Sequence, residues 1–237
     1  MKKFKRVLAL AMAVILSVPT IITTGMGTVP VKAAGDTVEL TVSSESAKYA
    51  GYETRKMYAG GNYAYCVQPS KKTPQSGTYE KHYDVENYVS NAGDETQAVQ
   101  SRNLAYYCWG APGFNASYFP STWYDGSAMD DDKYIALSHI MLSFLVSYDE
   151  VGSMHGCNSS FKNWVYQNVL GYNANGDLVN GQATLPILCW SAAPASFKVY
   201  ILSTGSATQN ILGYEYTPIG TVSLSKTSAN TGITSGN

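Results

Sequence analysis

Alternating apolar and polar residues mark both ends of the chain, whereas helical spacing marks its middle. Segment 36–46, DTVELTVSSES, alternates and therefore predicts a strand. A second strand is expected over 63–68, with Tyr63, Tyr65 and Val67 on one face and Cys66 on the other. Strands are also expected near the end of the chain, at 183–190, 196–202, 210–218 and 220–228.

Three helices are predicted between these strands. Segment 94–107 begins with acidic residues and stops at WGAPG, which is typical of a helix that ends at a glycine and proline breaker. The strongest helical pattern follows MDDDKY, where Asp131 or Asp132 is expected as the cap. A third helix is expected over 159–172. Helices between two groups of strands predict an α+β fold, β-rich with an inserted helical subdomain.

The first 34 residues have the composition of a secretory signal. A basic start, MKKFKR, precedes an apolar run that is too short for a membrane span, and cleavage is expected near Ala33 or Ala34. A membrane anchor is the alternative, which Pro19 and the following Thr and Gly residues disfavour. About 203 residues (237 − 34) remain, enough for one domain with a real core, expected over 35–218.

Charge and composition give no sign of binding to nucleic acid, to an anionic membrane or to a metal. The net charge is −1 and 14% of residues are charged, so no basic footprint for nucleic acid or an anionic membrane is present. No Cys or His spacing typical of a metal site occurs, and no metal or cofactor is expected. The 19 tyrosines suit strands and contact surfaces.

The four cysteines leave several chemical interpretations open. In an exported chain, Cys66, Cys108, Cys157 and Cys189 would commonly form two disulfides. Alternatively, Cys66 is a nucleophile, which needs an activating base such as histidine. His139 lies in an apolar helical segment and is either a core residue or the partner of Cys66 in a Cys-His hydrolase.

Three motifs, in order, give the chain a family resemblance. The motif YCV contains Cys66, the stretch NLAYYCWGAPG follows it, and TQNIL contains Gln209. Over residues 50–218 this set resembles the thioester domains of Gram-positive surface adhesins and pilus tip proteins. The resemblance implies an internal thioester between Cys66 and Gln209 that reacts once with a target amine, for example a protein lysine. It implies a secreted, cell-wall adhesin that needs no cofactor and is not a turnover enzyme.

The sequence also departs from the family pattern. Ser138 and His139 stand where the family usually has Thr-Gln in a helix, so the resemblance gives His139 the role of a supporting polar residue or a base. Cys108 stands where glycine is more usual. Two alternatives to covalent adhesion therefore stay open: a degenerate module for non-covalent binding or spacing, and a Cys-His hydrolase or transpeptidase.

The last 19 residues carry a second resemblance. Segment 219–237 contains GTVSLSKTS, which resembles the first strand of a Cna-B-like or SpaA-like β-sandwich module. In those modules a lysine at the position of Lys226 forms an isopeptide bond. We therefore expect 219–237 to be a linker and the start of a further module of a longer, wall-anchored protein.

Overall fold

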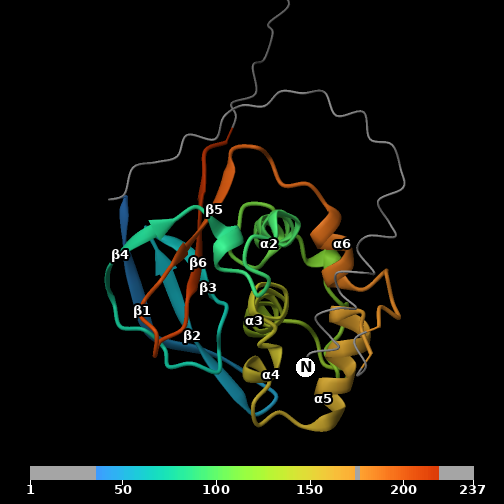
Figure 1. Ribbon diagram of the computed structural model, residues 1–237. Coiled ribbons are helices and arrows are strands. Elements are labelled where there is room, and N and C mark those ends of the chain that lie inside the picture. Colours follow the sequence, from blue (N-terminus) through green and yellow to red (C-terminus); the bar gives the residue numbers. More distant parts are fainter. Residues whose placement is uncertain (1–35, 174–176, 219–237) are drawn as a thin grey trace, which may run out of the picture.

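A six-stranded barrel packs against a set of helices (Figure 1). The computed structural model describes residues 36–173 and 177–218. The predicted signal segment 1–34 and the predicted module start at 219–237 lie outside these residues. Within the described residues, the α+β class with helices inserted between two groups of strands is confirmed.

The barrel strands come from both ends of the described chain. Each strand pairs antiparallel with its neighbours, in the closed order β1-β2-β3-β6-β5-β4. The strands are β1 (Thr37–Tyr49), β2 (Tyr52–Ala59), β3 (Asn62–Cys66), β4 (Gly77–His82), β5 (Phe197–Leu202) and β6 (Ile211–Tyr216). The turn between β2 and β3 uses Gly60 and Gly61, both with positive φ, as a tight two-residue hairpin requires.

The hairpin of β5 and β6 is joined to the rest of the barrel by two short seams. β6 pairs with β3 only at Cys66↔Ile211 and at the adjacent position. β5 pairs with β4 only at His82↔Ile201 and at the adjacent position. The barrel is therefore weakest in backbone pairing on both sides of this hairpin.

A charged cluster crosses the seam between β4 and β5. Lys81 Nζ donates to Glu215 Oε1 at 2.6 Å and to Asp36 Oδ2 at 3.3 Å. Tyr83 Oη lies 2.9 Å from the same Asp36 oxygen and 3.0 Å from the same Glu215 oxygen, so its single proton is shared between them. These bonds tie β4 to the start of β1 and the end of β6, although partial solvent exposure limits the stability gained from each pair.

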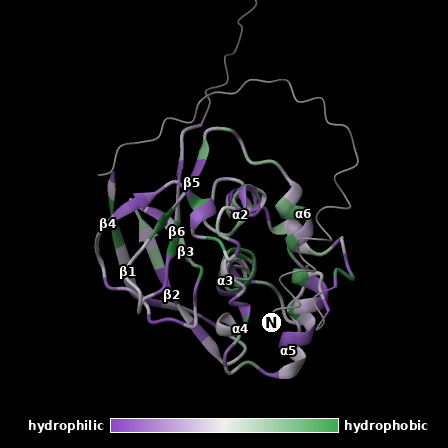
Figure 2. Ribbon diagram, viewed as in Figure 1, coloured by the Kyte–Doolittle hydropathy of each residue, from purple (hydrophilic) through white to green (hydrophobic). Residues whose placement is uncertain are grey.

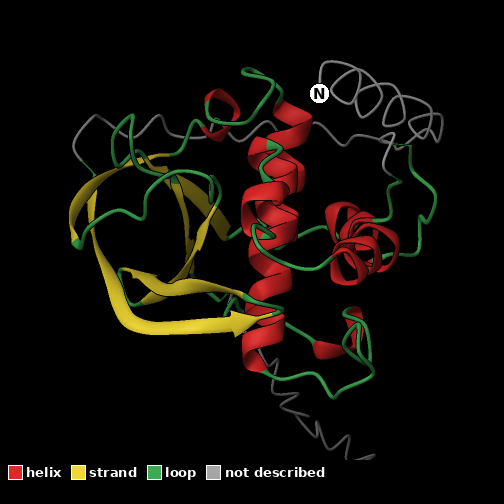
Figure 3. Ribbon diagram, turned by 90° about the horizontal axis from the view of Figure 1, so that it is seen from below, coloured by secondary structure: helices red, strands yellow, loops and turns green. Residues whose placement is uncertain are grey.

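The helical part lies between β4 and β5 in the sequence. Its elements are η1 (Val85–Asn87), α2 (Glu95–Tyr107), η2 (Ala116–Tyr118), α3 (Asp131–Ser147), α4 (Glu150–Ser153), α5 (Ser159–Trp164), η3 (Val165–Leu170) and α6 (Thr184–Trp190). α2 and α3 lie side by side against the barrel, and α5 and α6 lie on their far side (Figure 1). Figure 3 shows the same arrangement turned by 90°, with the barrel on one side of the central helical layer and further helices on the other. Figure 2 shows apolar residues concentrated along α3, as its position between two layers requires.

Two details of the predicted helical region were wrong. The cap of α3 is Asp130, whose carboxylate accepts from Lys133 N at 3.0 Å, whereas Asp131 and Asp132 lie in the first turn. The segment 183–190, predicted as a strand, forms α6. Its Pro186 is tolerated because a residue in the first helical turn needs no intrahelical N–H bond.

The alternation predicted for β3 is confirmed and divides the core in two. Tyr63, Tyr65 and Val67 pack into the larger core with α3 and the other helices. Ala64 and Cys66 belong to the smaller core inside the barrel. Within the described residues, no helix is both long enough and apolar enough to cross a membrane.

Candidate functional site

A pocket opens where two neighbouring strands separate. β2 and β3 pair up to Met57↔Ala64 and then diverge. Thr54 and Arg55 lie on one side of the opening and Cys66 on the other. The end of the barrel is therefore open at the cysteine that the sequence singled out.

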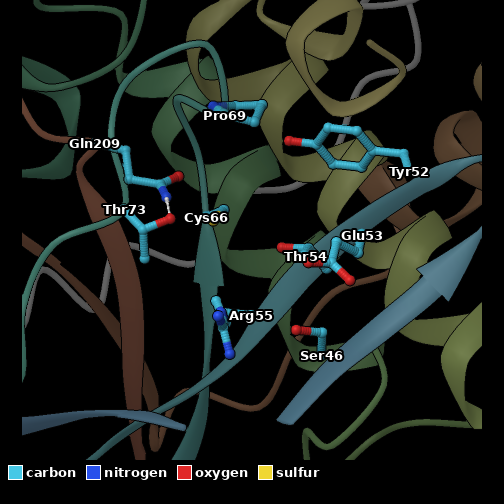
Figure 4. A pocket seen from close by; sticks show the side chains of 9 residues that line it. All are labelled: Ser46, Tyr52, Glu53, Thr54, Arg55, Cys66, Pro69, Thr73 and Gln209. Carbon is cyan, nitrogen blue, oxygen red and sulfur yellow. Dashed lines mark hydrogen bonds between the residues drawn. The ribbon is translucent and has the colours of Figure 1, made fainter. Parts of the chain in front are cut away.

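The pocket is small and brings together residues far apart in the sequence. Its volume is about 160 Å³, below the roughly 300–1,000 Å³ of sites that bury whole ligands. The lining residues are Ser46, Tyr52, Glu53, Thr54, Arg55, Cys66, Pro69, Thr73 and Gln209 (Figure 4). These dimensions suit entry of one slender side chain.

Cys66 and Gln209 meet in this pocket although 143 positions (209 − 66) separate them. Both side chains are buried, with 4% and 3% of their surface exposed. Burial raises the pKa of the Cys66 thiol to about 12, and hydrogen bonds from the side chains of Thr54 and Gln209 act in the opposite direction. The thiol is therefore protonated at neutral pH and lies in hydrogen-bonding reach of the glutamine amide.

The backbone of Gln209 is held firmly, whereas its side-chain amide is poorly bonded. Gln209 N donates to Lys72 O at 3.0 Å, and the Thr204 hydroxyl donates to Gln209 O at 2.7 Å. In addition to its interaction with the Cys66 thiol, the amide Nε2 makes one long contact, 3.5 Å, with Thr73 Oγ1 (Figure 4). The amide Oε1 is buried and has no hydrogen-bond partner. A buried carbonyl without a partner destabilises the folded state by roughly 1–3 kcal/mol.

His139 reaches the main chain of Cys66. Its Nδ1 accepts from Cys66 N at 3.1 Å, so the proton of the neutral ring is on Nε2, which lies 3.3 Å from the Tyr63 hydroxyl. The strand separation explains this bond, because β2 leaves the Cys66 N–H without a strand partner. Burial lowers the pKa of His139 to about 3. The ring is thus neutral, and its one free lone pair is used by a backbone N–H.

Ser138, the residue before His139, supports the segment that follows α2. Its Oγ accepts from Trp109 N at 3.0 Å. Burial raises the pKa of the neighbouring Cys108 thiol to about 12, although a hydrogen bond with the Ser138 side chain acts to lower it. Ser138 and His139 therefore fix two different segments from adjacent positions of α3.

The loop after Cys66 is fastened to the end of α3. Asp149 Oδ2 accepts from Ser70 N at 2.8 Å and from Ser70 Oγ at 2.7 Å. Ser147 Oγ donates to Val67 O. Because Pro69 and Thr73 of this loop line the pocket, these bonds fix one of its walls.

All four cysteines are free and buried, so the interpretation as two disulfides is wrong for this structure. Among residues 36–173 and 177–218, no group of three or more His, Cys, Asp or Glu side chains is placed to hold a metal ion.

Comparison with known protein families identifies the domain. The family model of the thioester domain matches residues 37–175, more than half of the chain, so the chain belongs to the thioester domain family. The matched segment contains Cys66 and His139 and ends before Gln209. No curated protein and no solved structure matches the chain significantly.

Several pocket residues were missed by the sequence analysis. Thr54 and Thr73 carry no motif, and their positions depend on the strand separation and on the loop between β3 and β4. Asp149, which holds this loop through Ser70, was missed for the same reason. A threonine in a strand or a loop is too common to stand out before the fold is known.

Proposed function

We propose that this domain forms an internal thioester between Cys66 and Gln209 and transfers the Gln209 acyl group to an amine of a target molecule. The observation that carries the proposal is the meeting of a buried thiol with a buried, under-bonded glutamine amide in one small pocket. Membership of the thioester domain family supports it.

Bond formation joins the two side chains and consumes no other reactant. Cys66 Sγ attacks Gln209 Cδ, the C–N bond breaks, and the thiol proton leaves with the nitrogen as ammonia. Thr73 is placed to hold the departing nitrogen, since its hydroxyl contacts Nε2. Bond formation removes Nε2 and keeps the buried Oε1 as the carbonyl oxygen of the thioester.

The pocket suits storage of a reactive acyl group. Both partners are nearly inaccessible to water, which slows hydrolysis. An incoming amine forms an amide with Gln209 and returns Cys66 to the thiol. Each molecule reacts once, as expected for a covalent adhesin at a cell surface. The secretory signal at 1–34, a Gram-positive cell wall and attachment to a longer stalk belong to this proposal.

The site does not favour a Cys-His hydrolase. Such an enzyme needs a cysteine of lowered pKa beside a histidine that can take its proton. Here burial raises the pKa of Cys66, and the free lone pair of His139 binds the Cys66 N–H. The same contacts suit a supporting role for His139 rather than the role of a base.

Intact-mass measurement of the purified protein tests the proposal. We expect a mass lower than that of the sequence by one ammonia. Cys66→Ala and Gln209→Ala should both abolish this loss, and Cys108→Ala, a matched control at another buried thiol, should retain it. Methylamine should add to Gln209 of the wild type alone.

Thiol counting gives an independent readout. After rapid unfolding with an alkylating reagent present, Cys66 should be protected and the other three cysteines modified, whereas methylamine-treated protein should react at all four. A full-mass protein whose Cys66 is alkylated would overturn the thioester and leave non-covalent binding as the function.

A further inference from the structure

We propose that Glu53 selects positively charged amines for the reaction and accepts the proton that the amine must lose. This inference rests on the proposed thioester function and names the residue that determines its acceptor class. Among the side chains that line the pocket, Glu53 is the only carboxylate.

Strand geometry places Glu53 at the pocket. Glu53, Thr54 and Arg55 all line the opening where β2 leaves β3 (Figure 4). Side chains alternate along the strand, so the buried Thr54 faces inward, whereas Glu53 and Arg55 are exposed at the rim of the pocket. The Arg55 guanidinium is held by the Ser44 carbonyl at 2.5 Å. The pocket therefore has one cation that is fixed in place and one carboxylate.

The Glu53 carboxylate is available to a ligand. Its ion pair with Lys48 Nζ is long, at 4.0 Å, and both side chains are mostly exposed. An exposed pair of this kind contributes little and exchanges readily with another cation. An ammonium group entering the pocket can therefore take the place of Lys48.

The reaction of an amine with the thioester requires a group that can remove a proton from the amine. Alkylamines such as the lysine side chain are protonated at neutral pH and cannot attack until one proton is removed. Glu53 attracts the ammonium and takes this proton, which passes to solvent. The nitrogen then bonds to Gln209 Cδ, the C–S bond breaks, and the second proton goes to Cys66 Sγ.

Other proton acceptors near the thioester are less suitable. The Asp149 carboxylate also acts on the Cys66 thiol, but it lies outside the pocket lining and accepts from Ser70 N and Ser70 Oγ. His139 is committed to the Cys66 N–H and lies on the opposite face of β3 from the cysteine side chain. The remaining lining side chains are hydroxyls, an amide, a proline, a thiol and a guanidinium. A carboxylate at the entrance thus distinguishes a charged amine from a neutral nucleophile.

The test compares two small nucleophiles by mass spectrometry. Methylamine is cationic at neutral pH and hydroxylamine is not. Glu53→Gln should form the thioester as fully as the wild type and react about five-fold more slowly with methylamine, the effect of one unit charge near a water-exposed ammonium. Its rate with hydroxylamine should be unchanged. Glu80→Gln on β4, outside the pocket, is the matched control and should alter neither rate.

Ionic strength provides the second readout. Added salt should slow methylamine addition to the wild type and have less effect on Glu53→Gln. Equal loss of both rates in Glu53→Gln, or no loss of either, would overturn the role of Glu53. A wild-type protein of full mass would instead refute the thioester itself, so the two failures are distinguishable.

Discussion

His139 should make the stability of the fold depend on pH in a defined direction. The ring is 1% exposed, and burial lowers its pKa to about 3. In the unfolded chain the pKa returns to about 6.5. Between these values the unfolded chain binds a proton that the folded protein excludes. The contribution of His139 is therefore complete above about pH 6.5 and is lost as pH falls toward 3.

The size of this effect follows from linkage. Each pH unit below the unfolded pKa costs about 1.4 kcal/mol, so lowering the pH from 7 to 5 should remove about 2 kcal/mol of unfolding free energy through His139 alone. Other groups also titrate in this range. The informative quantity is thus the difference in pH dependence between the wild type and a variant without the histidine.

Urea unfolding at pH 7 and pH 5 measures this difference. All proteins should carry Cys66→Ala, so that a cross-link cannot differ between them. His139→Gln can still accept the N–H of residue 66 and should lose about 2 kcal/mol less than the parent on acidification. His139→Ala leaves that N–H unbonded and should be less stable than the parent by about 1–3 kcal/mol at pH 7. Its stability should depend on pH as weakly as that of His139→Gln. His155→Gln, at an exposed position, should keep the parent's pH dependence. Equal pH dependence in the parent and His139→Gln would refute a buried neutral imidazole.

Three further substitutions test other parts of the structure. Asp149→Ala removes both bonds to Ser70 and should speed hydrolysis of the proposed thioester, measured as the return of free thiol, because one pocket wall is loosened. Glu150→Gln should raise the thermal midpoint more at pH 8 than at pH 5, since burial raises the pKa of Glu150 and the folded state therefore loses stability as its carboxyl ionises. A higher midpoint only at pH 5 would contradict that sign. Gly213→Ala would place a Cβ 2.5 Å from a tyrosine ring and should destabilise by about 1–3 kcal/mol in urea, whereas Gly181→Ala, with open space around it, should be tolerated.

The sequence predicted the elements better than it predicted their contacts. Alternation was sufficient to assign the two faces of β3, because one face meets α3 and the other fills the barrel. The apolar run that forms α6 was misread, since a short apolar segment fits a strand or a buried helix equally well.

Only those residues of the candidate site that lie in recognisable sequence motifs could be predicted from the sequence. Cys66 and Gln209 were named from motifs that resemble the thioester domain family, and both side chains line one pocket of the structure. The bond from His139 to the Cys66 main chain depends on where β2 leaves β3, which no local pattern encodes. The same applies to Glu53, an ordinary glutamate in a strand until the pocket is known.

The position of Gln209, directly before β6, has a mechanical consequence. In the proposed bonded state, tension between a captured target and the residues after Tyr216 would run through Gln209 and β6 alone. That strand is already extended, at about 3.3 Å per residue, so it can lengthen very little under tension. The other five strands and the helices lie outside this covalent path, as does the short seam between β4 and β5. The domain could therefore hold its target under load without unfolding, because the pull bypasses nearly all of its own structure.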